Sequence, residues 1–575
     1  MYLIGLGKKE IQNIPTGIGM LGFAIPEQRI TGYRHPLHAR AFVVAHPESG
    51  TRIIYCVAEL CFMTQSIRHG VLEKLQNDFP QHKINEHNLM LAATHTHSGP
   101  AGYSHFLLYN MTAPGFVTSV YESIVEAIVE CIVEACTRQE PGEVCLAQEE
   151  IPNHQKVAFN RSLKAYNQNP EIDPVPNDAR NEAVDRSMTV LRFQAKDGRA
   201  LGMFSFFAVH CTSYHSDNGL IDSDNKGVAA RKFERFAARE FGQENFVAGF
   251  AQTTAGDVSP NYVWDPKRGI MAGEFESDEN SAIYNGEIQN EFATKLFKKA
   301  HNKPLEVKPL RSRIHYEDHG QIDVNPEFCD GRLNQRTSPG DIGLSMIMGT
   351  AEGRGPLYHA RPAVEAINRL TGVSKKIFNQ IQSRTTGEVD KNYEARFTFL
   401  DLARGYAGRC FYLFKQGRPI LPGFVDPGVA RVRHLNKNDA VGDSPWTPQV
   451  LPVQLMTLGE LALVAIPGEP TTIAGRRLTQ SLKPQLEKIG IKQTLIAGFA
   501  NAYAGYVTTH EEYAIQAYEG GSTHFGAWTL AGFQTRYDAL VRELCADELG
   551  QPLDTGLSPY VASQEELYFR RYELA

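Results

Sequence analysis

The chain of 575 residues contains no stretch of about twenty uncharged apolar residues, the length that a membrane-spanning helix needs. Its most apolar long segment, residues 116–136, carries a glutamate at every fourth position from 122 to 134, which predicts an amphipathic helix. The first fifteen residues lack a basic region followed by an apolar core, so we expect no signal peptide. This absence predicts a cytoplasmic location. If a leader was removed from the sequence, the predicted location is secreted or periplasmic. Peripheral membrane contact is an open alternative.

An excess of positive charge is also missing, because 58 Lys and Arg residues stand against 65 Asp and Glu residues, for a net charge of −7. Nucleic-acid-binding domains usually carry a basic patch, so nucleic acid is not an expected partner. Nine cysteines lie far apart, without C-x-x-C or zinc-ribbon spacing. We expect buried free thiols and a reducing compartment by default, although a chain with a large core can also be secreted without disulfides.

Several common enzyme motifs do not occur. Residues 17–22 fit G-x-G-x-x-G, but no convincing strand precedes them, and Pro26 stands where the phosphate-binding helix would run. There is no Walker A sequence and no H-E-x-x-H, and the loop that carries Ser259 is not the G-x-S-x-G elbow of α/β-hydrolases. These absences argue against a dinucleotide-binding protein, a P-loop protein or an α/β-hydrolase.

Apolar strands alternate with helical patterns along the chain, and several strands are apolar throughout. This pattern indicates α/β layering, with a sheet that is covered on both faces. The expected elements are hairpins over 40–60 and 188–210, helices near 66–79, 115–138, 225–241 and from Thr471 or Thr472, and buried strands over 88–97, 245–252, 460–466 and 493–500. Residues 320–450 are richer in Gly and Pro, and we expect excursions from the main domain there, with one helix near 361–383.

Two apolar strands end in histidines. His95 and His97 follow the first strand, and residues two apart in an extended chain point to the same face. Neutral imidazole is a good zinc ligand, although two hydrogen-bonded histidines in a turn would give the same sequence. His210 ends the second strand, and by itself it fits a satisfied core histidine better than a ligand. A second strand with a histidine at its end raises the case for a shared site.

Three loops after buried strands carry further polar residues. One presents Asp257 and Ser259, which fits either a serine near a metal-bound water or an Asx-type turn. Glu469 stands in a P-G-x-P turn before a helix, where its carboxylate is either a metal ligand or a favourable charge at the helix start. Residues 501–518 are rich in tyrosine, which is typical of packing or of a binding wall.

In order along the chain, these segments resemble the neutral (non-lysosomal) ceramidase family, amidases that cut ceramide into sphingosine and a fatty acid. The matching strings include THTHSGPAGYSHFLLYN (94–110), FNRSLKAYNQNP (159–170), FVAGFAQTTAGDVSPN (246–261), PGEPTTIAGRRL (467–478) and NAYAGYVTTHEEYAIQAYEGGSTHFG (501–526). We therefore expect a catalytic domain over residues 1–535 and a helical C-terminal tail over 536–575. The immunoglobulin-like domain with which the family typically ends is not expected here.

The resemblance implies an α/β fold in which a mixed β-sheet sandwich carries helices on both faces. It implies one zinc ion per chain, held by four residues, His95, His210, Glu469 and Tyr506. The residues that it implies for catalysis and substrate contact are Ser259, His97, Arg161 and Tyr518. The implied partner is a lipid substrate, ceramide or another N-acyl amine.

Amide hydrolysis suits these residue types. Zinc lowers the pKa of water and polarises a carbonyl, while Ser259 is suited to orient the water rather than to act as a strong base. His97 or a tyrosine hydroxyl is expected to stabilise the oxyanion, and Asp224 or Asp257 to fix the histidine tautomers. We predict a zinc-dependent amidase that hydrolyses the N-acyl bond of ceramide. The alternatives are a related zinc hydrolase acting on another N-acyl lipid or a small soluble amide, and a non-catalytic lipid-binding module.

Overall fold

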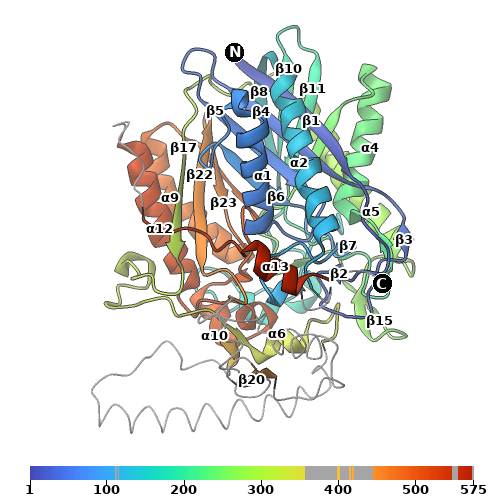
Figure 1. Ribbon diagram of the computed structural model, residues 1–575, viewed down its shortest axis with the longest axis vertical. Coiled ribbons are helices and arrows are strands. Elements are labelled where there is room, and N and C mark those ends of the chain that lie inside the picture. The colour runs from blue at the N-terminus through green and yellow to red at the C-terminus, as the bar shows by residue number, and fades with distance from the viewer. Residues whose placement is uncertain are drawn as a thin grey trace.

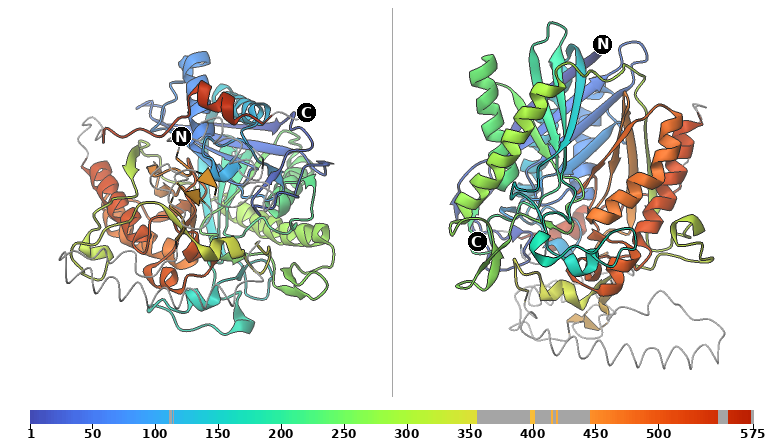
Figure 2. Two further views of the ribbon diagram at one scale, coloured as in Figure 1. Left: turned by 60° about the horizontal axis from the view of Figure 1, so that its bottom comes forward. Right: turned by 180° about the vertical axis from the view of Figure 1, so that it is seen from behind.

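Two β-sheets lie face to face in the middle of the molecule, and helices cover the outer face of each (Figure 1; Figure 2, right). The computed structural model describes residues 1–110, 113, 115–355, 398–401, 414–415, 418–419, 445–546 and 555–572. This architecture confirms the predicted mixed α/β sandwich with helices on both faces. Within the described residues, no helix combines the length and the apolar character that crossing a membrane requires.

The larger sheet has eight strands and contains both parallel and antiparallel pairs. In spatial order they are β13 (Val247–Ala251), β11 (Ala200–Phe206), β10 (Ser187–Ala195), β8 (Glu140–Glu150), β1 (Tyr2–Ile11), β4 (Leu37–Ala45), β5 (Arg52–Ala58) and β6 (Leu89–Ala93). The parallel pairs are β5 with β6 and β11 with β13. The helices on the outer side of this sheet are α1 (Gln65–Asp78), α2 (Thr118–Thr137), α4 (Asp224–Phe241) and α5 (Asp278–Ala300).

The smaller sheet has four strands and comes mostly from the C-terminal part of the chain. In spatial order they are β17 (Ser312–Asp318), β22 (Val450–Leu458), β23 (Leu461–Ala465) and β25 (Gln493–Ala497). Its parallel pair is β23 with β25. The helices α9 (Thr472–Lys488) and α12 (Thr529–Cys545) cover its outer face, opposite the larger sheet.

Aromatic and aliphatic side chains fill the layer between the two sheets. The Phe42 ring lies 5.5 Å from Tyr55 and 5.0 Å from Phe204 between ring centroids, and this cluster meets Met456 and Leu463 of the smaller sheet. The opposite side of the same strands packs under the outer helices. Because both faces are covered, these strands are apolar without alternation, which is the pattern that the sequence showed.

The structure confirms most of the predicted elements. The helices expected near 66–79, 115–138 and 225–241 are α1, α2 and α4, and α9 begins after its N-cap Thr471, whose hydroxyl accepts a hydrogen bond from the Ala474 N–H. The central strand β1 was not predicted, because Lys8 and Lys9 interrupt its apolar pattern. The helix expected near 361–383 lies outside the described residues.

The C-terminal segment returns to the N-terminal half of the chain. The short helix α13 (Gln564–Arg570) places Leu567 against Phe116, and Arg570 Nη1 donates a hydrogen bond to the His105 carbonyl at 2.7 Å. The division at residue 535 stays a prediction, and this position lies inside α12. Seven of the eight cysteines that the structure describes are buried free thiols, as expected.

A buried ion network links β4, β5 and α4. Arg40 is 2% exposed and donates to Glu59 Oε1 at 2.7 Å through Nη1 and to Glu234 Oε1 at 3.0 Å through Nε. Burial would raise the pKa of Glu59, but the Arg40 charge and the hydrogen bond from His38 hold it far below its ordinary value. Glu59 is therefore ionised at neutral pH, and its charge depends on Arg40 for compensation.

Replacing this arginine by Arg40→Leu should lower the free energy of unfolding by about 3–5 kcal/mol, because the buried Glu59 carboxylate loses its Arg40 partner while Glu234 keeps only Lys8. The measurement is chemical denaturation of both proteins. Since the pKa of Glu59 is depressed in the folded state, the stability it contributes is present above its unfolded pKa and is lost only as pH falls toward the folded value. In Arg40→Leu these carboxylates stay buried without the arginine charge, so their folded pKa values rise and protonation relieves the penalty. The difference between the two proteins should therefore be largest at neutral and higher pH and shrink as the pH falls.

The matched control is Lys267→Ala, which removes an ion pair with Glu276 that is exposed on both sides. Water screens such surface pairs and they contribute little to stability, so this variant should unfold almost like the unmodified protein. Equal stability of Arg40→Leu and Lys267→Ala would contradict the proposed role of the network.

Candidate metal centre

Five strand ends bring polar residues to one edge of the sandwich. From the larger sheet, His95 follows β6, His210 follows β11, and Ser259 lies in the loop after β13. From the smaller sheet, Glu469 follows β23 and Tyr506 follows β25. Each of these strands belongs to a parallel pair, and polar residues at the carboxyl ends of parallel strands are the usual position of functional sites in α/β folds.

His95 and His210 are each held in one tautomer by a backbone carbonyl. His95 Nδ1–H donates to the Cys61 carbonyl at 2.7 Å, and His210 Nδ1–H donates to the Val258 carbonyl at 2.9 Å. A carbonyl oxygen only accepts, so each Nδ1 carries a proton, and in the neutral imidazole Nε2 then presents a lone pair. His95 also has a positive φ of 71°, which is rare for a residue other than glycine and common at functional sites.

The Glu469 carboxylate meets both lone pairs. Its Oε2 lies 3.5 Å from His95 Nε2 and 3.2 Å from His210 Nε2. Burial alone would raise the pKa of Glu469, but the two imidazoles and a hydrogen bond from Tyr503 lower it to about 2. Burial lowers the pKa of His95 to about 3, against the opposing effect of Glu469. At neutral pH the group therefore contains a carboxylate and a neutral His95.

These three residues fit a metal ion. His210 Nε2 and Glu469 Oε2 are buried and have no hydrogen-bond partner among the described residues, which is costly for a polar atom unless something else binds it. The three ligand atoms lie within 4.8 Å of one another. Ligand atoms at about 2.0–2.2 Å from a tetrahedral zinc ion are about 3.3–3.5 Å apart, close to the two distances from Glu469.

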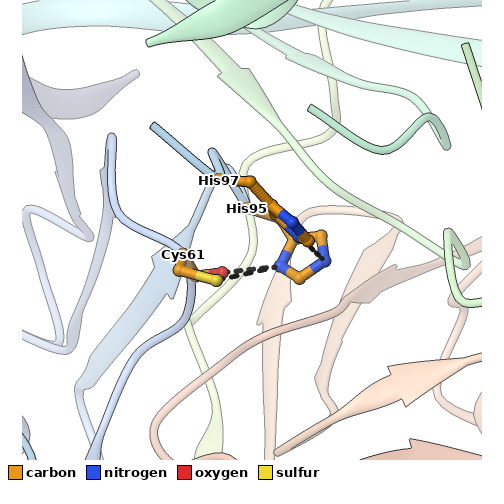
Figure 3. A group of neighbouring side chains, drawn as sticks. All are labelled: Cys61, His95 and His97. Atoms are coloured by element: carbon orange, nitrogen blue, oxygen red, sulfur yellow. Dashed lines mark hydrogen bonds between the residues drawn. The ribbon is translucent and has the colours of Figure 1, made fainter. Parts of the chain in front are cut away.

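A second group of possible ligands consists of Cys61, His95 and His97 (Figure 3). Cys61 Sγ lies 3.8 Å from His95 Nδ1, but this nitrogen already carries the proton that it donates to the Cys61 carbonyl. Burial and the nearby Glu469 charge raise the pKa of the Cys61 thiol well above its ordinary value. A protonated thiol is a poor ligand, so the group of His95, His210 and Glu469 fits a metal better.

Tyr506 and Arg161 lie beside this group. The short strands β24 (Glu469–Pro470) and β26 (Tyr506–Val507) are parallel and place Tyr506 opposite Glu469. Arg161 Nη2 donates to the Tyr506 hydroxyl oxygen at 2.9 Å, while Arg161 Nε donates to Glu519 at 2.8 Å. Burial and the Glu469 charge raise the pKa of Tyr506 well above its ordinary value. Tyr506 as a fourth ligand stays a prediction.

Ser259 is fully buried in the short strand β14 (Val258–Ser259). Its Oγ accepts a hydrogen bond from the Asn261 N–H at 2.8 Å. The preceding residue, Val258, provides the carbonyl that holds the His210 imidazole. The chain therefore places Ser259 next to a candidate ligand, although its role in a reaction stays a prediction.

His97 completes the imidazole cluster. Its Nε2 lies 3.2 Å from His95 Nε2. Because the neutral His95 Nε2 can only accept a hydrogen bond, His97 Nε2 carries the proton that is donated to it. Gly22 gives the His97 ring its space, since a Cβ at position 22 would lie 2.3 Å from His97 Cγ, and Phe23 packs on the ring at 4.6 Å. Residues 17–22 fit G-x-G-x-x-G but were not expected to bind a nucleotide. Their last residue, Gly22, thus lies beside the site.

Two further tyrosines surround the group. The Tyr518 ring lies 5.6 Å from that of Tyr506, and the Arg161 guanidinium is 5.6 Å from the Tyr518 ring. Tyr503, which sequence reasoning did not select, donates its hydroxyl to Glu469 Oε1 at 2.5 Å and stacks on Phe62 at 3.9 Å. The tyrosine-rich segment was the available signal, but the sequence does not distinguish which tyrosine reaches Glu469.

The expectation that Asp224 or Asp257 fixes the histidine tautomers is wrong, because backbone carbonyls do so. Asp257 Oδ1 instead accepts from the Thr472 N–H and hydroxyl, both at 2.8 Å, at the start of α9. Asp224 Oδ2 accepts from the Tyr214 N–H at 3.1 Å. Both aspartates therefore shape the loops around the site and do not contact the imidazoles.

Gln252 connects the two strand ends that carry the histidines. Its Nε2 donates to the carbonyl of Thr94 at 2.9 Å and to that of Val209, and its Oε1 accepts from the Val209 N–H at 3.2 Å. Thr94 and Val209 directly precede His95 and His210. One buried amide therefore fixes the spacing of both backbones just before the candidate ligands.

The fold and this geometry define an α/β sandwich protein with a buried His–His–Glu candidate metal centre. The sequence profile described as "Neutral/alkaline non-lysosomal ceramidase, N-terminal" matches residues 2–401 and 434–535. This chain belongs to the neutral ceramidase family.

Individual relatives agree with the family assignment. The neutral ceramidase of Pseudomonas aeruginosa is 34% identical over 539 residues, which cover 93% of this chain and 70% of that protein. Neutral ceramidase B of Dictyostelium discoideum is 32% identical, over 99% of this chain and 75% of its own length. The crystal structure of the Pseudomonas aeruginosa enzyme matches with a TM-score of 0.74 at 30% identity, over 97% of this chain and 77% of that chain.

Substitutions can decide between the two candidate ligand groups. His210→Asn and Glu469→Gln should each weaken zinc binding by at least about 100-fold, the upper end of the loss that follows from removing even an outer partner of a ligand. Cys61→Ser, the matched control, should bind zinc like the unmodified protein. Equilibrium dialysis with zinc measures all three. Loss of zinc in Cys61→Ser with retention in His210→Asn would assign the metal to the other group.

Proposed function

We propose that this protein is a zinc-dependent amidase that hydrolyses the N-acyl bond of ceramide to give sphingosine and a free fatty acid. The observation that carries the proposal is the convergence of two imidazole lone pairs and one carboxylate oxygen in a buried site of a chain that belongs to the neutral ceramidase family. When zinc is bound, it supplies Lewis-acid chemistry, which polarises an amide carbonyl and makes water nucleophilic at neutral pH. His95, His210 and Glu469 would hold it, with Tyr506 as the fourth ligand.

His97 and Tyr518 are suited to donate hydrogen bonds to the developing oxyanion. Burial lowers the pKa of His97 well below its ordinary value, so this imidazole is neutral at pH 7, and its Nε2–H points toward His95 Nε2. Once that nitrogen is engaged as a ligand, the His97 N–H is available to the substrate. Burial raises the pKa of Tyr518, so its hydroxyl keeps its proton and can donate. Donors fixed in place before the reaction stabilise the charge that develops in the transition state.

Arg161 and Ser259 complete the proposed assignment. Burial opposes the charge of Arg161, but Tyr506, Glu519 and other acidic neighbours raise its pKa well above its ordinary value, so the guanidinium stays positive beside the site. It is suited to contact the amide or the head group. Ser259 Oγ accepts from the Asn261 N–H at 2.8 Å and donates only a long hydrogen bond of 3.4 Å to the Asn261 carbonyl, so its hydrogen is suited to turn to the attacking water and orient it.

Metal removal tests the reaction class. Protein stripped with a chelator should lose hydrolysis of N-acyl sphingosine, and about one equivalent of zinc per chain should restore it, because the donor set holds one ion. Release of fatty acid by the stripped and reloaded samples is the measurement. Full activity in the stripped sample would exclude the proposed mechanism. Cleavage of short soluble N-acyl amines alone, with ceramide left intact, would favour the alternative of a hydrolase for small amides.

The variant Ser259→Ala should lower kcat for ceramide by about 100-fold or more, because the water loses the group that orients it. Its zinc content should not change, since Ser259 is not among the proposed ligands. Ser49→Ala, in an exposed turn between β4 and β5, is the control and should keep full activity. Unchanged turnover by Ser259→Ala would refute the role given to this serine.

A further inference from the structure

Two buried acceptor atoms near the candidate metal centre receive no hydrogen bond from the part of the chain that the structure describes. Glu352 Oε1 and Asn261 Oδ1 have no hydrogen-bond partner among the described residues, and each of the two residues is 4% exposed. Unlike His210 Nε2 and Glu469 Oε2, these atoms are not explained by a metal ion on His95 and His210. A buried acceptor without a donor is unfavourable, so hydrogen-bond donors of a molecule bound there would stabilise the pair.

The contacts of both side chains fix which atoms are free. Asn261 Nδ2 donates to the Thr212 carbonyl at 2.8 Å and to Glu352 Oε2 at 3.2 Å, and both partners only accept. The amide therefore cannot be turned around, and its oxygen is necessarily the free end. Glu352 Oε2 also accepts from the Thr212 hydroxyl at 3.0 Å, which leaves Oε1 as the free oxygen. The two free acceptors thus belong to side chains that hold each other in place.

This acceptor pair, Glu352 and Asn261, is connected to the residues of the candidate site. The Asn261 N–H donates to Ser259 Oγ at 2.8 Å. Glu352 Oε1 lies 3.8 Å from Arg161 Nη1, and the other terminal nitrogen of that guanidinium donates to the Tyr506 hydroxyl at 2.9 Å.

The segment that carries Glu352 also packs near His97. A Cβ on Gly353 would lie 2.9 Å from the Phe23 ring, and that ring packs on His97 at 4.6 Å. The acceptor pair is therefore next to the place where the substrate amide would react.

The neighbouring Arg161 decides what kind of ligand suits the pair. Its positive charge beside Glu352 disfavours a metal cation or an ammonium group at the same place, whereas hydroxyl and amide N–H groups are neutral donors. A carboxylate accepts stronger hydrogen bonds than a neutral oxygen does. A ligand with two or more neutral donors close together therefore matches the two acceptors.

We propose that Glu352 and Asn261 bind the head group of the substrate, an N-acylated 2-amino-1,3-diol, by accepting hydrogen bonds from its hydroxyl or amide N–H groups. This inference rests on the proposed amidase function and names the part of the substrate that the site selects. Ceramide carries two hydroxyls beside its amide N–H, so it supplies the donors that the pair lacks. A site built to bind a hydroxyl discriminates strongly against an analogue without it, because its buried acceptors then stay unpaired.

The variant Glu352→Gln tests the proposal with two substrates. For an N-acyl 2-amino-1,3-diol, kcat/KM should fall about 10–100-fold, because charge-assisted hydrogen bonds are lost. For an amide of the same acyl chain with an alkylamine that lacks hydroxyls, the variant and the unmodified protein should differ by less than about threefold. Glu317→Gln, on β17 of the smaller sheet and paired with Arg536, is the matched control and should leave both values unchanged. Zinc content and melting temperature of each variant are measured alongside.

A binding measurement separates this proposal from the amidase activity. An N-alkylsulfonyl derivative of the diol is not hydrolysed, and calorimetry should show about tenfold weaker binding to Glu352→Gln than to the unmodified protein. Equal loss on both substrates, or equal binding of the derivative, would overturn the head-group site. If the unmodified protein cleaves no N-acyl amino alcohol with zinc bound, the proposed function fails, and the calorimetric comparison still decides whether the acceptor pair binds the diol.

Discussion

The ionised carboxylate of Glu469 is the constraint on which the site depends. The residue is 1% exposed, its pKa is depressed to about 2, and its Oε2 faces two imidazole nitrogens that present lone pairs. One carboxylate oxygen, Oε1, accepts from the Tyr503 hydroxyl, while Arg161, the cation in the same network, directs its donors to Glu519, Gly256 and Tyr506. The other oxygen, Oε2, receives no hydrogen bond from the described residues, which is costly for a buried charged atom. A divalent cation would remove this cost, so ion binding and the local fold are expected to stabilise each other.

The sandwich architecture explains how residues so far apart in the chain converge. His95 and His210 come from the larger sheet, and Glu469 and Tyr506 come from the smaller one. Neither sheet supplies a complete set of ligands, and the aromatic and aliphatic layer between them sets the distance at which the two halves meet. The packing of that layer, rather than any local segment, therefore determines the geometry of the centre.

The sequence indicated those parts of the site that follow from strand ends. Apolar strands that end in His95 and His210 predicted two converging imidazoles, and the structure brings them together with Glu469. The partners that fix the tautomers were predicted wrongly, because they are the backbone carbonyls of Cys61 and Val258. Every residue has a backbone carbonyl, so the residue type does not show which one accepts a hydrogen bond. Side-chain identity predicts donors and acceptors of side chains, and backbone contacts depend on where the chain turns.

Tertiary contacts explain the other omissions. Tyr503 and Tyr506 stand three residues apart in one tyrosine-rich segment, and only the fold shows that the first donates to Glu469 while the second accepts from Arg161. Glu352 lies in a Gly-rich region without periodicity, so no pattern linked it to Asn261, 91 residues earlier. The central strand β1 escaped prediction because its lysines point to partners such as Glu234 that lie far along the chain.

The Gln252 side chain has a consequence for selectivity between ions. Because one amide binds the backbones immediately before both histidines, neither imidazole can be displaced without moving the other. As candidate metal ligands, the two imidazoles would form a bidentate pair whose separation is set by the protein and not by the bound ion. A pair of fixed nitrogen ligands does not adjust to the radius of the ion. It therefore disfavours large hard cations, which need six to eight oxygen ligands, relative to metals that bind in a tetrahedral geometry.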